Sequence, residues 1–323
     1  MPVRRAVLAV VVTRPVVVLR ALGLGDALTA VPALRGLRRL YGGRPLLLAG
    51  REPVSGWLGR LGLVDGVVPT EGLSARPPGL SLGRHTAVNL HGKGPQSHLL
   101  LQAPADDLVA FDCPAACYRS TTRWQLDEHE VDRWCRLVND AAGSSSCSVE
   151  DLRLGDLRLG VDGDAVVVHP GAASGARQWP VARWIRVVEE LAADGRRVVL
   201  TGSEEELCGR IAARTGGDDL SGRLSLDELA ATIASAALLL SGDTGVAHLA
   251  TALGTRSVTL FGPTPPAWWG PAIDLDLHTV LYHGSRLGDP HSPLPDEALL
   301  RITEAEVLRA ARDHLACSPS RAG

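Results

Sequence analysis

The sequence is poor in the features that mark nucleic-acid-binding and membrane-spanning proteins. Its formal net charge is only −3 over 323 residues, so it lacks the basic field that holds a nucleic acid, and we expect no nucleic-acid partner. No apolar run approaches the roughly 20 residues of a membrane-spanning helix. The run from Ala6 to Val12 is short for a signal peptide, and no A-x-A cleavage site follows it. We therefore expect a cytoplasmic protein with at most peripheral membrane contact.

Metal-site patterns are also missing. None of the six cysteines belongs to a C-x-x-C pair, and no histidine cluster completes the closest spacing, that of Cys113 and Cys117. The cysteines are therefore interpreted as small apolar residues in a reducing compartment. We expect no metal site and no cofactor.

The first half of the chain does contain a regular alternation of short apolar runs and helical stretches. Strands are predicted at residues 15–22, 44–50, 66–69 and 86–92. Apolar residues recur at helical spacing between the first two strands, at Leu28, Val31, Leu34 and Leu37. Pro32 fits this helix only if the helix bends or starts there. The alternation indicates a parallel sheet with helices on both faces.

The same pattern restarts after a stretch rich in Gly, Ser and Asp at residues 141–164. Strands are predicted at 165–171, 196–203, 237–245 and 257–264, and helices at 180–195, 225–236, 245–254 and 302–315. Ser225 and Glu228 have the spacing of a capping box. We predict an α/β fold of two Rossmann-like domains, 1–158 and 159–323, and leave open whether the last helix packs back on the first domain.

Asp26 follows two glycines, Gly23 and Gly25, at the predicted turn from the first strand into a helix. The glycines allow a sharp turn, but the third glycine of a dinucleotide-binding G-x-G-x-x-G motif is replaced by Leu28. Asp26 has two interpretations: it caps the helix, or it is a general base at the carboxyl end of the strand.

Strand-end turns in the second half carry polar residues suited to an anion. In HPGAASGARQWP, small residues around Ser174 free backbone N–H groups, and Arg177 offers a cation to a phosphate, or is a solvated surface charge. In LTGSEEEL, one of Glu204, Glu205 and Glu206 accepts ribose hydroxyls, or all three simply favour a helix start.

Two further turns complete the predicted donor rim. In SGDTGVAHLATALG, the turn of Asp243, Thr244 and Gly245 enters a helix whose N-terminus suits a diphosphate, with His248 one turn on. Asp243 and His248 have alternative interpretations as a cap and a packing residue. In LFGPTPP, Gly262 and Thr264 form another strand-end turn that can contact phosphate. Together these turns predict an anion-binding rim.

The acceptor is predicted on the first half. Four residues are candidates for acceptor binding: Gly25, Lys93, Gln96 and His98. The last three belong to NLHGKGPQSHLLL, and the alternative is that this segment is an ordinary polar loop.

Three motifs in the same order and spacing give a family resemblance over nearly the whole chain: LGDALTAVPALRGLR, HPGAASGARQWP and SGDTGVAHLATALGTRSVTLFGPT. The chain resembles glycosyltransferase family 9, the ADP-heptose:lipopolysaccharide heptosyltransferases. The resemblance implies the GT-B architecture, with two Rossmann-like domains facing across a cleft. It implies an inverting, metal-independent transfer, with Asp26 as the general base.

The resemblance also assigns the donor residues. Arg177 stands where the family has a phosphate-binding lysine, so the cation is kept and its geometry differs. Asp243, Thr244 and Gly245 match the donor-contacting turn, and the family's ribose-binding glutamate aligns with Glu204 or Glu206. The expected donor is a nucleotide-diphosphate sugar, ADP-heptose by resemblance, and the acceptor is a glycan, a lipid-linked or a small molecule. A GT-B-like nucleotide-sugar epimerase and a non-catalytic nucleotide-sugar-binding protein stay open as alternatives.

Overall fold

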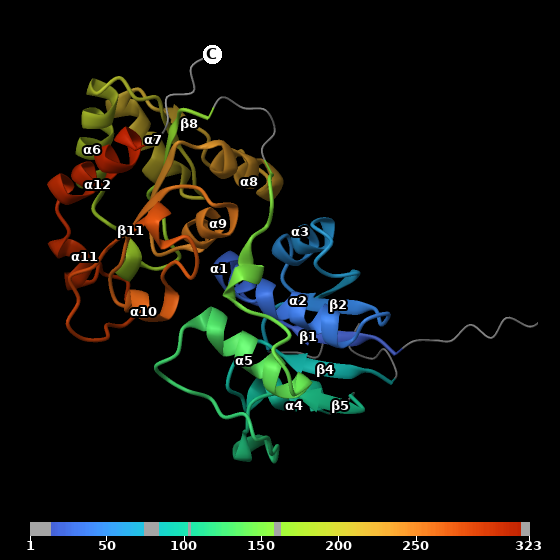
Figure 1. Cartoon of the computed structure of the whole chain (residues 1–323). Coiled ribbons are helices and arrows are strands. Elements are labelled where there is room, and N and C mark those ends of the chain that lie inside the picture. Colours follow the sequence, from blue (N-terminus) through green and yellow to red (C-terminus); the bar gives the residue numbers. More distant parts are fainter. Residues whose placement is uncertain (1–13, 74–83, 103–104, 158–162, 318–323) are drawn as a thin grey trace, which may run out of the picture. The chain divides into compact units, whose positions relative to one another are not determined.

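The chain forms two compact α/β units (Figure 1). The computed structural model describes residues 14–73, 84–102, 105–157 and 163–317. The first unit comprises residues up to Ala21 and Gly36–Arg123, and the second unit comprises Leu22–Arg35 and the chain from Trp124 onward. The predicted domain boundary between residues 158 and 159 lies outside the described residues and stays a prediction.

The first unit is built on a five-stranded parallel sheet with the order β3-β2-β1-β4-β5. The central strand β1, VVVL, is buried on both faces, which is why it is uniformly apolar. The bounds are β1 Val16–Leu19, β2 Leu46–Gly50, α3 Val54–Arg60, β3 Gly66–Pro69, β4 Thr86–Asn89, α4 Gln96–Gln102, β5 Asp107–Val109 and η2 Pro114–Ala116.

The second unit is built on a six-stranded sheet with the order β11-β10-β9-β6-β7-β8, and every pairing in it is parallel. Its strands are β6 Val166–His169, β7 Val198–Leu200, β8 Asp218–Asp219, β9 Leu238–Gly242, β10 Ser257–Leu260 and β11 His278–Leu281. Parallel pairing sends the carboxyl ends of all these strands to one edge of the sheet, where ligands of such folds bind.

The second unit also contains helices and 3₁₀ turns. Their bounds are α1 Leu24–Thr29, α5 Glu130–Ala142, η3 Val149–Leu152, η4 Gly175–Arg177, α6 Val181–Ala193, α7 Glu205–Thr215, α8 Leu226–Ser235, α9 Gly245–Leu253, α10 Pro266–Trp269, η5 Leu275–Leu277, α11 Glu297–Arg301 and α12 Glu304–Ala316. Of these, α6, α7, α9 and α12 pack against strands of the six-stranded sheet. The last helix, α12, packs against α6, β9, β10 and β11 of its own unit. The option that it packs back on the first domain stays a prediction.

Several local predictions are confirmed. Ser225 caps α8 in a full capping box with Glu228. The helix predicted from the spacing of Leu28, Val31, Leu34 and Leu37 is divided at Ala30 into α1 and α2, Val31–Leu40, so Pro32 falls in the first turn of α2. Proline is tolerated in a first turn because that turn's N–H groups have no intrahelical partner.

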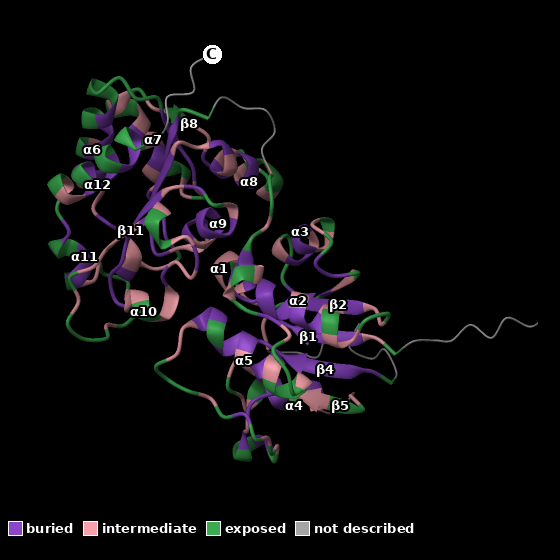
Figure 2. Cartoon of the chain, in the orientation of Figure 1, coloured by how far each residue is buried: buried purple, intermediate pink, exposed green. Residues whose placement is uncertain are grey.

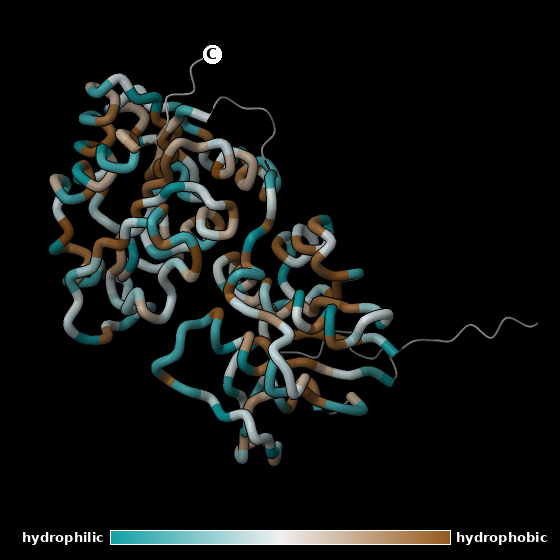
Figure 3. Tube along the Cα trace, viewed as in Figure 1, coloured by the Kyte–Doolittle hydropathy of each residue, from teal (hydrophilic) through white to brown (hydrophobic). Residues whose placement is uncertain are grey.

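Burial follows the sheets: the strands of both units are largely buried and the outer helix faces are exposed (Figure 2). Apolar residues gather along the strands, brown in Figure 3, and the exposed turns of α6 and α7 are hydrophilic. Of the free cysteines, Cys117 and Cys317 are exposed and the others are buried. A bilayer crossing takes about 20 residues; none of the helices in the described ranges combines that length with sufficient hydropathy.

Candidate functional site

The candidate site lies at the carboxyl edge of the second sheet, within the second unit. Most of the predicted donor residues follow the ends of β6, β7, β9 and β10, which are neighbours or near neighbours in this sheet. Helix α1, which carries Asp26, belongs to the same unit and packs against α9. The predicted base and the predicted donor turn are therefore parts of one compact body.

Two glycines allow the starts of α1 and α9 to approach each other. A Cβ atom on Gly25 would stand 2.8 Å from Cδ2 of His248, and one on Gly245 would stand 2.8 Å from Cβ of Leu24 and 3.1 Å from the Gly25 nitrogen. Such distances are shorter than carbon contacts in packed proteins, so only glycine fits at either position. Gly25 thus lies at the contact between the two helices, and its predicted contact with the acceptor stays a prediction.

The approach brings charged groups together around Asp243, which is only 5% exposed. Burial raises the pKa of the Asp243 carboxyl to about 6; the Arg177 guanidinium opposes that rise and the Asp26 carboxylate adds to it. Arg177 donates from Nη1 to the Asp243 carbonyl at 3.3 Å. Its Nε is buried and has no hydrogen-bond partner among the described residues. A buried donor of this kind suits an anionic ligand.

Asp26 and Asp243 are not the helix caps that the sequence left as alternatives. The N-cap of α1 is Gly23, and Asp26 lies in the first turn. The N-cap of α9 is Thr244, which makes no side-chain capping bond. Its Oγ1 instead donates weakly to the carbonyl of Gly242 at 3.4 Å. The backbone N–H groups at the start of α9 are therefore not capped by Thr244 and point to the same edge of the sheet.

His248 lies on α9 beside this cluster. Its ring meets the ring of Trp269 edge to face, with the centroids 5.8 Å apart. This contact fits the packing interpretation of His248, whose ring also faces Gly25. Contact of His248 with the donor stays a prediction. Sequence reasoning did not single out Trp269, because a tryptophan in a short loop helix carries no pattern that marks a site.

Three other predicted donor residues are engaged in packing. Ser174 donates from Oγ to the carbonyl of Pro290 at 2.6 Å, so its hydroxyl is left only as an acceptor. Gly262 is buried against Ala176 and Leu299, where a Cβ atom would come within 3.1–3.2 Å of their atoms. Thr264 is 9% exposed. Donor contact from these three stays a prediction.

The two glutamate candidates occupy different environments. Glu204 precedes α7, and its Oε2 accepts from the backbone N and the Oγ of Ser203, both at 3.1 Å. That carboxylate reaches over Gly171 at the end of β6, where a Cβ atom would stand 2.1 Å from Oε2. Glu206 is exposed on α7. The ribose role therefore fits Glu204 better than Glu206.

A cavity of about 350 Å³ opens at the ends of β6 and β7, close to Glu204. The lining of this cavity is largely apolar, with polar groups from His169, Thr201 and Ser203. The lining residues are Leu24, His169, Thr201, Gly202, Ser203, Leu220, Gly222, Leu224, Leu229, Gly245 and Val246. His169 Nδ1 bonds to Thr201 Oγ1 at 3.0 Å. Burial lowers the pKa of His169 to about 4, so the ring is neutral near pH 7.

Sequence reasoning missed this cavity. Its apolar residues come from four separate elements and loops, and each one alone has the pattern of a core residue. Only His169 and Thr201, at the ends of two predicted neighbouring strands, gave a signal that could have been used.

The first unit holds the predicted acceptor residues Lys93, Gln96 and His98. Lys93 and Gln96 are exposed, Gln96 as the first residue of α4. His98 is fully buried: Nε2 bonds to the carbonyl of Phe111 at 2.8 Å and Nδ1 lies 3.1 Å from Nδ2 of Asn89. Both ring nitrogens are thus occupied, so the structure favours a packing role for His98 over contact with an acceptor.

No group of three or more His, Cys, Asp or Glu residues with the arrangement of a metal site occurs in the described ranges. The expectation that no metal is needed stays a prediction, because it concerns the reaction.

Curated relatives match parts of the chain. Lipopolysaccharide heptosyltransferase 1 of Pseudomonas aeruginosa is 37% identical over 97 residues, 29% of this chain and 27% of that protein. Lipopolysaccharide heptosyltransferase 2 of Salmonella typhimurium is 29% identical over 189 residues, 54% of this chain and 52% of that protein. The chain thus spans between about a quarter and a half of the length of these relatives.

Solved structures share the whole fold. The glycosyl transferase family 9 structure from Veillonella parvula has a TM-score of 0.77 at 20% identity, covering 94% of this chain and 98% of that one. E. coli heptosyltransferase WaaC with ADP-2-deoxy-2-fluoro heptose has a TM-score of 0.71 at 20% identity, covering 93% and 99%. At this identity the likeness concerns the fold alone, and it confirms the predicted GT-B architecture of two parallel α/β domains.

The family model for glycosyltransferase family 9 (heptosyltransferase) matches residues 114–286, which is more than half of the chain. Its match includes β6, β9 and β10, whose carboxyl ends hold Arg177, Asp243 and the other donor candidates. The chain belongs to glycosyltransferase family 9.

Proposed function

We propose that the protein is an inverting glycosyltransferase that moves a heptose or a similar sugar from a nucleotide-diphosphate donor, ADP-heptose, to an acceptor hydroxyl without a metal or another cofactor. The observation that carries the proposal is the cluster of Asp26, Arg177 and Asp243 at the carboxyl edge of the second sheet. A cation with a buried free donor and a carboxylate beside it are what a displacement at a sugar phosphate needs.

In this proposal the nucleoside and the diphosphate of the donor bind at two neighbouring places. The base enters the apolar cavity at β6 and β7, and Glu204 receives the ribose hydroxyls at its rim. The diphosphate lies against Arg177 and the backbone N–H groups at the start of α9. The cavity volume of about 350 Å³ is at the lower end of the usual range for small-molecule sites, which suits one base better than a whole nucleotide.

The reaction is a single displacement. Asp26 takes the proton of the acceptor hydroxyl as that oxygen attacks the anomeric carbon from the face opposite the diphosphate. The new carbon–oxygen bond forms while the bond from the anomeric carbon to the phosphate oxygen breaks, and the nucleoside diphosphate leaves with the bonding electrons. Arg177 and the α9 amides stabilise the negative charge that develops on it. The exposed Lys93 and Gln96 remain the candidates for acceptor binding.

One observation favours a second candidate, a nucleotide-sugar epimerase. Such an enzyme needs several carboxylates at the sugar, and Asp243 supplies a second one beside Asp26. The two functions differ in whether turnover requires an acceptor, so they can be separated with the donor alone.

The test is an incubation of the purified protein with ADP-heptose, in parallel with ADP-glucose and UDP-glucose, with and without a glycan acceptor mixture and in EDTA. Mass spectrometry of the products should show sugar transfer only when an acceptor is present. The transfer should release ADP, and EDTA should not reduce its rate. An epimerised donor formed without acceptor would establish the second candidate. If EDTA abolishes transfer and magnesium restores it, the metal-independent mechanism is overturned. If the protein binds ADP but turns over none of the donors, it is a nucleotide-sugar-binding protein and not an enzyme.

A further inference from the structure

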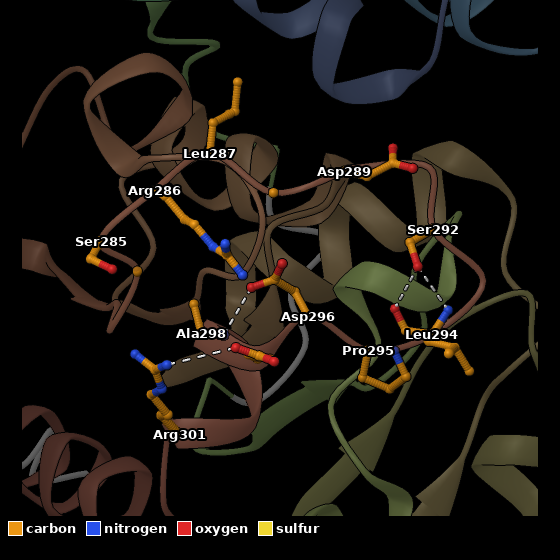
Figure 4. A pocket seen from close by; sticks show the side chains of 13 residues that line it. Ser285, Arg286, Leu287, Asp289, Ser292, Leu294, Pro295, Asp296, Ala298 and Arg301 are labelled. Atoms are coloured by element: carbon orange, nitrogen blue, oxygen red, sulfur yellow. Dashed lines mark hydrogen bonds and ion pairs between the residues drawn. The ribbon is translucent and has the colours of Figure 1, made fainter.

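A second cavity, of about 360 Å³, lies between β11 and α11 and shares no lining residue with the cavity at β6 and β7 (Figure 4). Its lining is Gly284, Ser285, Arg286, Leu287, Gly288, Asp289, Ser292, Leu294, Pro295, Asp296, Glu297, Ala298 and Arg301. The irregular segment from Tyr282 to Asp296, which has no helix or strand of its own, supplies most of this lining. Irregular segments of this length in compact domains are usually functional or disordered.

This segment is held in place by hydrogen bonds to the neighbouring turns. Gly288 donates from its backbone N to Pro263 at 2.9 Å, and Asp296 donates to the Ala176 carbonyl at 3.1 Å. Ala176 in turn donates to the Ser292 carbonyl at 2.9 Å. Gly288 also approaches Asp296 so closely that a Cβ atom would stand 2.4 Å from its Oδ2. The cavity wall is therefore built in one defined conformation.

Charged groups of both signs face this cavity. Figure 4 shows the Arg286 guanidinium directed toward the Asp296 carboxylate. Arg301 forms a second pair, with Glu297. The second pair is loose, with 3.8 Å between Nη2 and Oε2. Asp296 Oδ1 accepts from the Ala298 backbone N at 2.8 Å, which leaves Oδ2 for another donor. Hydrogen-bonding capacity therefore remains on both the guanidinium and the carboxylate side.

An apolar surface completes the lining. Leu294 is 71% exposed, and Pro295 and Ala298 lie beside it in the lining. Leu287, 57% exposed, also belongs to the lining, so two large apolar side chains border the polar groups. The cavity volume is within the range of small-molecule sites.

We propose that this cavity binds an uncharged saccharide of one or two rings. Sugar hydroxyls both donate and accept, so they can bond to the carboxylates of Asp296 and Glu297 and to the guanidinium of Arg286. The C–H face of a sugar ring fits the apolar surface at Leu294. A strongly anionic ligand is disfavoured because three carboxylates line the cavity beside two guanidiniums, and a wholly apolar ligand would leave those charges buried without partners.

The experiment is a ligand-observed NMR titration of the full chain with α-1,2-mannobiose, maltose, cellobiose and inorganic phosphate. Two variants test the cavity: Arg286→Ala removes the guanidinium beside Asp296, and Ser285→Trp fills the cavity from an exposed position. Arg210→Ala, an exposed arginine on α7, is the matched control. ADP affinity is measured on every variant, and it should stay unchanged.

At least one disaccharide should bind to the unmodified chain. Arg286→Ala should weaken that binding about tenfold, as expected for one charge-assisted hydrogen bond. Ser285→Trp should abolish it, and Arg210→Ala should leave it unchanged. The proposal is overturned if no disaccharide binds, if binding survives Ser285→Trp, or if phosphate displaces the sugar. If the unmodified chain does not bind ADP, the proposed donor site is wrong, but the proposal for this cavity is not affected.

Discussion

The ends of strands β4 and β9 occupy similar places in their two sheets, but the buried polar side chains there differ in whether they have hydrogen-bond partners. Asn89, the last residue of β4, is fully buried, and its amide bonds to the Ser97 hydroxyl at 2.9 Å and accepts from the His91 backbone at 3.0 Å. Asp243, directly after β9, is buried with a raised pKa, beside an Arg177 Nε that has no hydrogen-bond partner among the described residues.

The difference separates a structural polar cluster from a binding site. A buried network in which each group has a partner makes the fold more rigid, and a ligand could enter it only by breaking those bonds. A buried carboxyl with a raised pKa next to an unsatisfied guanidinium costs folding free energy, and such arrangements gather where a ligand supplies the missing partner. On this ground the β9 end is the better candidate for chemistry.

The sharpest test of the β9 end is Asp26→Asn. The amide keeps the shape but cannot take a proton, so the transfer rate should fall by roughly 10²–10⁴-fold. Loss of a first-turn charge should cost at most about 1 kcal/mol of the free energy of unfolding. Single-turnover transfer, thermal melting and ADP affinity are measured together, and the last two should be nearly unchanged. Near-normal transfer would remove Asp26 from the mechanism.

The next largest effect is expected from Arg177→Ala. If Arg177 bonds to the donor diphosphate, its loss should weaken ADP binding by about 10–100-fold, since hydrogen bonds to charged groups contribute about 1.5–3 kcal/mol. Arg177→Lys should lose less, because the cation remains. Calorimetric titration with ADP measures both, with Arg210→Ala as the control. Equal affinity in Arg177→Ala and the unmodified chain would show that this cation faces no phosphate.

Asp243 should make stability depend on pH. Its pKa in the folded chain is about 6, above the usual 3.8, so the folded state holds the proton more tightly than the unfolded state. The resulting contribution of Asp243 to the free energy of unfolding is fully present below about pH 4 and is lost as the pH rises through 6. At pH 8, Asp243→Asn should therefore be more stable than the unmodified chain, by at most about 3 kcal/mol. Urea unfolding at pH 4 and pH 8 measures this, and the exposed Asp313→Asn should behave like the unmodified chain.

At the end of β4, substitution of a buried polar side chain should lower stability and leave ADP affinity unchanged. Asn89→Ala removes a satisfied buried amide and should lower the free energy of unfolding by about 1–3 kcal/mol. ADP affinity should remain within error, since the donor candidates belong to the second unit. Urea unfolding and ADP titration on one sample give both values. A selective loss of ADP binding without loss of stability would mean that the two strand ends are not as different as their hydrogen bonds indicate.

Local features were predictable from the sequence because they depend on neighbours a few residues away. The apolar runs predicted the central strands, the Ser225–Glu228 spacing predicted the cap of α8, and Pro32 predicted either a bend or a helix start at its position. The family motifs were contiguous as well, which is why Asp26, Arg177 and Asp243 could be named before their surroundings were known.

Only the tertiary structure decided which of these residues lie together. Gly25 and Gly245 are far apart in the chain, and their mutual approach depends on how α1 packs against α9. The same holds for the choice of Glu204 over Glu206, the burial of His98 and the two cavities. Each depends on the burial and hydrogen bonding of groups brought together from separate elements, and a one-dimensional pattern carries information on its own element alone.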